Sequence, residues 1–99
     1  MTKYINSFTG SETTLLSNAE KQKTGRLTKI NICNNAGTSE TISVFLNRNT
    51  DNQKTYIIRG MVMPAYSTLV LEDCLSFDIE SHSLRMAHDT SIDFSVILK

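Results

Sequence analysis

The sequence predicts an all-β protein, an antiparallel β-sandwich of the jelly-roll or immunoglobulin-like kind with about seven to nine short strands. From residue 25 to the C-terminus, short stretches alternate apolar and polar side chains, as half-buried strands do. Clusters of Gly, Asn, Asp, Ser or Pro interrupt these stretches every eight to twelve residues or so. No stretch has the apolar spacing of a helix, and the short connections favour antiparallel pairing.

The amino-acid composition predicts a single folded domain and argues against binding to nucleic acids or membranes. The 99 residues fit one domain, and 39% of them are hydrophobic, enough for a folded core. Ser, Thr and Asn supply 31 residues, which is typical of strands and turns. Ten Lys and Arg balance ten Asp and Glu, so the chain lacks the cationic excess that nucleic acids or acidic membranes require. Without a signal-like opening or an apolar run of about 20 residues, we expect no membrane association and synthesis in a cytoplasm.

Residues 1–24 differ from residues 25–99, the expected sandwich domain. Their apolar side chains are scattered among Thr, Ser, Asn and Lys. The segment is either an N-terminal arm that orders against a partner or a pair of short edge strands, Lys3–Thr9 and Thr13–Ser17. Its first apolar side chains, which we include among the candidate contact residues, are Tyr4, Ile5 and Phe8.

From residue 25 onward seven strands are expected: Lys29–Asn34, Thr41–Leu46, Thr55–Arg59, Ser67–Leu71, Leu75–Ile79, Leu84–His88 and Thr90–Leu98. Gly60 is expected to end the third, and Pro64 makes 61–66 a connection, since proline cannot donate to a ladder. Alternation places these residues inward: Ile30, Ile32, Ile42, Val44, Leu46, Ile92, Phe94, Val96 and Leu98.

No set of residues predicts catalysis, a metal site or a cofactor. Cys33, Cys74, His82 and His88 are the only nucleophile or base candidates, and Cys74 follows two carboxylates that would raise its pKa. The histidines lack the spacing of zinc ligands. The cysteines are expected to be free thiols, because the cytoplasm is reducing. We therefore expect a protein that is not an enzyme.

With catalytic and metal sites set aside, the residues that still point to a function are apolar side chains predicted to lie outside the core. Phe45 and Ile97 lie opposite the core faces of their strands, and Met61 and Met63 flank a loop, where flexible thioethers can pack against a partner. A second sheet could cover these side chains; alternatively, they mark a subunit contact. The resulting candidates for a protein interface are Tyr4, Ile5, Phe8, Phe45, Met61 and Met63.

About three quarters of the chain resembles a group of small structural virion proteins of tailed bacteriophages. The resemblance follows an order of strand, Asn-rich loop, strand, hairpin, strand, Pro-Ala turn and Leu-Val-Leu strand. It rests on residues 25–35, 42–46, 56–58, 63–65, 68–71 and 75–77.

This resemblance implies a structural part of a phage particle without enzymatic activity or cofactor. The nearest type is a capsid decoration, or cement, protein that binds the outer head shell and stabilises it. Its partners would be the major capsid protein or other virion proteins and further copies of itself, with a trimer favoured, and its location the virion. A neck, tail or fibre-attachment protein of the same particle, or a small ligand- or glycan-binding module, are the alternatives.

Overall fold

The computed structural model describes residues 3–6, 8, 11–17, 26–76, 78, 80–88 and 93–99. These residues form eight β-strands in two antiparallel sheets and no helix, which confirms the predicted all-β sandwich. The strands are β1 (Lys3–Ile5), β2 (Glu12–Leu16), β3 (Arg26–Asn34), β4 (Glu40–Arg48), β5 (Lys54–Met63), β6 (Thr68–Ser76), β7 (His82–Ala87) and β8 (Phe94–Leu98).

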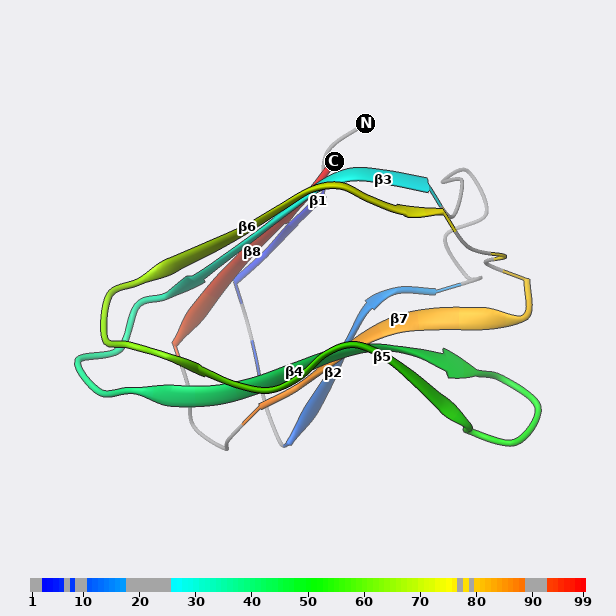
Figure 1. Cartoon of the computed structure of the whole chain (residues 1–99), viewed down its shortest axis with the longest axis horizontal. Coiled ribbons are helices and arrows are strands. Elements are labelled where there is room, and N and C mark those ends of the chain that lie inside the picture. The colour runs from blue at the N-terminus through cyan, green and yellow to red at the C-terminus, as the bar shows by residue number, and fades with distance from the viewer. Residues whose placement is uncertain are drawn as a thin grey trace.

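The strand order identifies the sandwich as a jelly roll. One sheet has the order β1-β8-β3-β6 and the other β2-β7-β4-β5. The pairs β1·β8, β2·β7, β3·β6 and β4·β5 are those of one long antiparallel ribbon, and rolling the ribbon adds β3·β8 and β4·β7. An immunoglobulin-like sandwich would instead pair several strands that are consecutive in the chain. Figure 1 shows the two sheets facing each other, with β6 and β5 in front as the edge strands.

The core lies between the sheets and follows the predicted alternation. Both predicted isoleucines of β3, Ile42 and Val44 of β4, and the alternate residues of β8 are buried. Leu46 packs against this core while remaining partly exposed. The predicted inward position of Ile92 lies outside the described residues. The fully buried side chains of the core include Leu15, Leu16, Ile30, Ile32, Ile42, Val44, Leu84, Met86 and Phe94.

Strand β5 is longer than predicted because two β-bulges let it continue. Met61 pairs with Ile42, but Ile58 pairs with Val44, so β5 contains one extra residue around Gly60. Gly60 has φ +65°, a backbone conformation that glycine adopts without strain. A second extra residue, at Ile57, follows in the same ladder. The glycine expected to end this strand therefore bends it instead.

Strand β6 joins two predicted strands into one. The acidic stretch after Leu71 reads as a turn in the sequence, yet the chain stays paired with β3 to Ser76. Leu27 pairs with Leu75 and Lys29 with Glu72, so one extra residue of β6 is accommodated in a bulge. Six strands, not seven, therefore follow residue 25 among the described residues.

The described parts of residues 1–24 belong to the sandwich. Strand β1 pairs with β8 and β2 with β7, each at the edge of its sheet. Between them, Phe8 packs its ring edge-on to His88 at 5.3 Å between centroids. Phe8, Leu15 and Leu16 are buried in the core. Removing the segment would therefore remove core side chains, which is not expected of a free arm.

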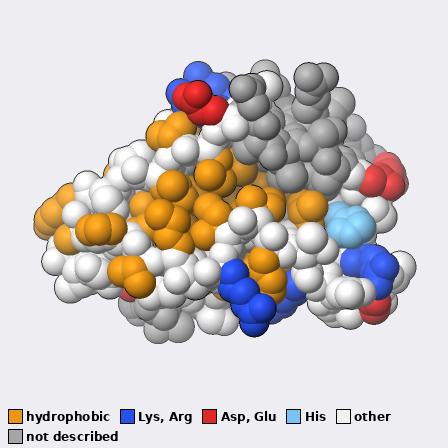
Figure 2. All heavy atoms as spheres, viewed as in Figure 1, with side chains coloured by type: hydrophobic (Ala, Val, Ile, Leu, Met, Phe, Trp, Pro, Cys, Tyr) orange, Lys and Arg blue, Asp and Glu red, His pale blue; other side chains and the backbone are white. Residues whose placement is uncertain are grey.

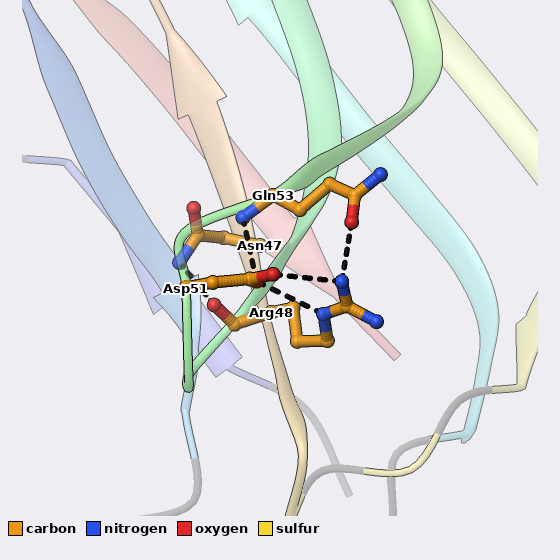
Figure 3. Close-up of polar contacts among 4 residues, drawn as sticks. All are labelled: Asn47, Arg48, Asp51 and Gln53. Carbon is orange, nitrogen blue, oxygen red and sulfur yellow. Dashed lines mark hydrogen bonds and ion pairs between the residues drawn. The ribbon is translucent and has the colours of Figure 1, made fainter.

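The connection between β4 and β5 is held by charged and polar side chains (Figure 3). Arg48 Nε and Nη2 donate to the Asp51 carboxylate at 2.9 and 2.8 Å, a bidentate pair, and Arg48 also donates to Gln53. The backbone N–H of Gln53 donates to Asp51 Oδ1 at 3.2 Å. Asn52 has φ 58°, which asparagine tolerates better than most residues.

We predict that Asp51→Asn lowers the free energy of unfolding at pH 7 and has no effect in acid. Hydrogen bonds from Arg48 hold the pKa of Asp51 below its ordinary value. A depressed folded-state pKa contributes stability at neutral pH, and this contribution is lost as the pH falls through the folded pKa. Urea titrations from pH 7 to below pH 4 should show the two proteins converging. A constant difference at every pH would contradict this role of the carboxylate.

Candidate protein interface

The sandwich is open along the side formed by the edge strands β5 and β6. Ile57 and Ile58 of β5, and Leu69 and Leu71 of β6, pack against the core but remain partly exposed. Met61 pairs with the inward-facing Ile42, yet its own side chain is exposed. Figure 2 shows hydrophobic side chains across the middle of this face and at its left end, with charged groups towards the margins. We call Ile57, Ile58, Met61, Leu69 and Leu71 the open edge.

The opposite side of the sandwich is covered. Leu15 and Leu16, on the edge strand β2, are buried, and Phe8 lies over the core beside Phe94, with ring centroids 6.1 Å apart. The two sides therefore differ: the chain covers its own core along β1 and β2 and leaves it partly exposed along β5 and β6. Such exposure of apolar surface is typical of an interaction site.

At one end the open edge continues into an exposed apolar tip, formed by Val62, Pro64 and Tyr66. Tyr66 is 74% exposed and Val62 58%, values that only a few large hydrophobic side chains of the described chain reach. Tyrosine supplies a large contact area with few rotatable bonds, and it is enriched among residues that dominate binding energy. The tip is therefore suited to anchor a partner.

A buried asparagine holds the tip in place. Asn34, at the end of β3, is fully buried. Its Nδ2 lies 3.0 to 3.2 Å from the carbonyl oxygens of Thr38, Met63 and Pro64, and its Oδ1 accepts from the N–H of Ala36 at 3.0 Å. One side chain thus ties the β3–β4 loop to the β5–β6 loop. A surface ordered before binding loses less entropy when a partner arrives.

Tyr66 itself has an unusual backbone. Its φ is 58°, in the left-handed region, where a bulky residue is strained. Its N–H donates to the carbonyl of Ala36 at 3.3 Å. A Cβ added to Gly37 would lie 3.1 Å from Tyr66 Oη, so the absence of a side chain there makes room for the phenol. Strain of this kind at an exposed aromatic residue favours a functional role.

The six residues proposed from the sequence fall into different environments. Tyr4 and Met61 are exposed, and Ile5 is partly buried against the core. Phe8, Phe45 and Met63 are buried within the single chain, so their side chains are not available at its surface as the sequence suggested. Met63 is buried because β5 continues through the predicted connection and turns it inward.

Phe45 does lie on the outer face of its sheet, as predicted, but its neighbours cover it. The ring of Tyr56 lies 5.5 Å away between centroids, and Lys54 Nζ sits 4.9 Å from the Phe45 ring centroid. Arg59 in turn lies 4.7 Å from the Tyr56 ring centroid. Alternation identified the face but could not show that these long side chains fold over it. Sequence reasoning also missed Val62 and Tyr66, although an aromatic residue directly after the Pro-Ala turn was a usable signal.

The thiol and imidazole groups have ordinary structural environments. Cys33 is free and its Sγ lies 3.3 Å from Asn35 Oδ1, while the side chain of Cys74 lies outside the described residues. His88 Nε2 lies 2.8 Å from Thr13 Oγ1, and His82 Nδ1 lies 2.7 Å from Ser81 Oγ. Within the described part of the chain, no group of three or more His, Cys, Asp or Glu side chains is placed to hold a metal ion. That part also contains no helix long and apolar enough to cross a membrane.

Comparison with known proteins supports the fold alone. No protein-family model and no curated protein matches the chain. Its structure is similar to a solved structure, the Anabaena sensory rhodopsin transducer, with a TM-score of 0.51 and 10% sequence identity. The match covers 94% of this chain and 98% of that chain. At this identity, the likeness concerns the arrangement of strands and not the activity.

We predict that Asn34→Ala lowers the free energy of unfolding by about 3 kcal/mol, because it leaves buried backbone groups without partners. The matched control is Asn35→Ala, which removes a side chain that donates to Ser95 Oγ at 2.8 Å in a less buried setting. This control should cost about 1 kcal/mol. Denaturant unfolding measures both. Equal losses would show that Asn34 does not hold the two loops.

We predict that Tyr66→Asn leaves the free energy of unfolding unchanged or raises it by up to about 1 kcal/mol, since asparagine tolerates positive φ. The exposed ring adds little to the fold of the isolated chain. Denaturant unfolding of the variant and the wild type is the test. A loss of more than about 1 kcal/mol would mean that the tyrosine ring serves the fold and not a partner.

Proposed function

We propose that this chain is a structural protein of a tailed-bacteriophage particle, a decoration protein that binds the outer face of the head shell and stabilises it. Two lines of argument support the proposal. The sequence from residue 25 onward resembles small virion proteins of such phages, and the jelly roll is a frequent architecture of viral structural proteins. Because many unrelated functions share one architecture, a function for this chain has to follow from the surface that the fold presents.

The observation that carries the proposal is the continuity of the open edge with the ordered tip. Together they offer apolar side chains from β5, from β6 and from the loop between them. Burying one Val, Leu, Ile or Met side chain fully contributes about 1.5–3 kcal/mol. Apart from Met61, the side chains of the open edge are already partly buried, so each would contribute only part of that free energy. A few such contacts with an anchoring tyrosine suffice for a modest single-site affinity.

Repetition would strengthen a modest contact. A shell presents the same surface many times, and linked copies bind with an effective concentration far above that of the free protein. The formal net charge of zero does little to keep copies of this chain apart. The partners are therefore the major capsid protein and neighbouring copies of the chain.

The bulges of β5 bear on how a partner binds. Bulges and strong twist keep an edge strand from pairing along its length with another strand. The extra residues at Ile57 and around Gly60 interrupt the regular ladder of β5. We therefore expect the shell to contact the apolar side chains and not to extend the sheet by a further strand.

The test uses particles or shells lacking this protein, to which purified protein is added back. We expect Val62→Asp and Tyr66→Ala to reduce binding at least tenfold, because they introduce a charge into the contact or remove its anchor. Both positions are exposed, so both variants should fold. Thr14→Asp is the matched control, since Thr14 is an exposed residue on the edge strand β2 at the other side of the sandwich. Co-sedimentation with shells measures the affinity.

Electron microscopy of the same particles shows where on the particle the protein binds. Hundreds of copies over the head surface would support the decoration role. A dozen or so copies at the neck or tail would overturn it in favour of a connecting protein of the same particle. Binding by the wild type, both tip variants and Thr14→Asp with equal affinity would show that the tip is not the contact and would remove the observation on which the proposal rests.

A further inference from the structure

A second surface, separate from the open edge, lies on the outer face of the β1-β8-β3-β6 sheet. Tyr4, Ile97, Asn31 and Val70 are paired in register across the four strands and form one row on that face. Tyr4 is 69% exposed and Val70 42%. The next outward-facing row contains Lys29 and Glu72, paired between β3 and β6, with Lys99 beside Lys29 at the end of β8. An apolar centre with a charged border is the usual anatomy of a protein interface.

On one side of β3 this face is hollow. The hollow has a volume of about 180 Å³ and is lined by Tyr4, Lys29, Asn31, Ile97 and Lys99. It therefore combines an aromatic ring and an aliphatic side chain with two ammonium groups. An occupant that presents an apolar group next to a carboxylate would match it.

On the other side of β3 the same face carries a ridge. Val70 and Glu72 are two residues apart on β6, so their side chains point to the same side of the sheet. The Glu72 side chain is 71% exposed, and its carboxylate is 4.0 Å from Lys29 Nζ, an open ion pair that contributes little within one chain. The ridge thus presents an apolar group next to a carboxylate, the combination that the hollow would accept.

Asn31 lies between the hollow and the ridge, and its side-chain oxygen is a hydrogen-bond acceptor without a donor in the described part of the chain. Its Oδ1 is shielded from solvent and has no hydrogen-bond partner among the described residues. A buried acceptor without a donor is costly, and native proteins rarely keep one without a reason. The terminal torsion of an asparagine is broad, so the amide can turn to meet a donor presented from outside.

We propose that two copies of this chain pair through this face, about a two-fold axis that runs along β3. Rotation about that axis places β8 of each copy over β6 of the other. Ile97 then meets Val70 of the second copy, and Lys99 meets its Glu72. Each ridge fills the hollow of the other chain, and the contact is made twice, as a two-fold interface requires.

The residues of β3 that lie on the two-fold axis also meet their own copies favourably. The amide of Asn31 meets its own copy, and an amide carries both donors and an acceptor, so each can donate to the other. Lys29 also meets its copy, where the adjacent Glu72 carboxylates of both chains offset the like charge. A second copy is therefore the occupant that this face fits, since hollow and ridge lie on one chain on opposite sides of β3.

The pairing is expected to be weak by itself. Four strands about 4.8 Å apart and about six residues long make a face of roughly 400 Å² per chain, small for a stable dimer. The inference does not depend on the proposed virion role, although pairs would bind a shell more tightly than single chains. It favours a two-fold pair where the resemblance suggested a trimer.

Sedimentation equilibrium of the purified chain, up to about millimolar concentration, tests the proposal with variants in which the charges at positions 99 and 72 are reversed singly and together. We expect the wild type to form dimers, and Lys99→Glu and Glu72→Lys each to weaken dimerisation about tenfold, because each acts at both symmetric contacts. The double variant should restore it to within about threefold of wild type. Asn31→Asp, which sets like charges against each other on the axis, should weaken it by at least tenfold.

The matched control is Glu80→Lys, the same charge change at an exposed residue outside this face. It should leave dimerisation unchanged. A wild type that stays monomeric throughout the concentration range, or that forms trimers, would overturn the proposal. So would a dimer in which the two single exchanges have no effect or the double variant is not restored. Because only the purified chain is used, failure here is separate from failure of the shell-binding test.

Discussion

The incomplete closure of the core is the constraint on which the other properties of this molecule depend. A two-sheet sandwich buries its inward-facing side chains only where something covers the gap between the edge strands. Phe8, Leu15 and Leu16 provide that cover along β1 and β2, whereas Ile58 and Leu71 remain partly exposed along β5 and β6. The chain therefore covers one side of its own core and leaves apolar surface on the other side that a partner could cover.

The tip beside this opening is held in one shape by hydrogen bonds within the single chain. Asn34 is buried and hydrogen-bonded to backbone groups of two loops, and those loops hold Tyr66 with φ 58°. The hydrogen bonds offset the strain, so the tyrosine ring remains exposed and oriented. The buried Asn34 therefore stabilises the two loops, while the exposed ring of Tyr66 stays available to the proposed partner.

The two proposed contact surfaces can operate together. The open edge lies along the gap between the sheets, while the row through Asn31 lies on the outer face of one sheet. Strand β6 contributes to both, because Leu69 and Leu71 face inward and Val70 and Glu72 face outward. A pair formed through the sheet face would present two open edges, and simultaneous attachment of both would raise the affinity for a repetitive surface.

The class of fold and most of the buried faces can be predicted from the sequence, because alternation in Ile30–Ile32 or Phe94–Leu98 leaves a strand only one way to face the core. Neither the jelly-roll strand order nor the partners of each edge follow from alternation, since they depend on contacts between residues far apart in the chain. Turn-like residues were misleading where a strand contains a bulge: Gly60 and the acidic stretch after Leu71 resemble turns but lie within strands.

Alternation assigns Phe45 to the outer face of its sheet but does not show that the side chain is buried there, because the covering residues Tyr56 and Lys54 come from the neighbouring strand. Which apolar residues remain exposed becomes visible only in the folded chain, since the exposure of a side chain depends on what distant parts of the chain cover.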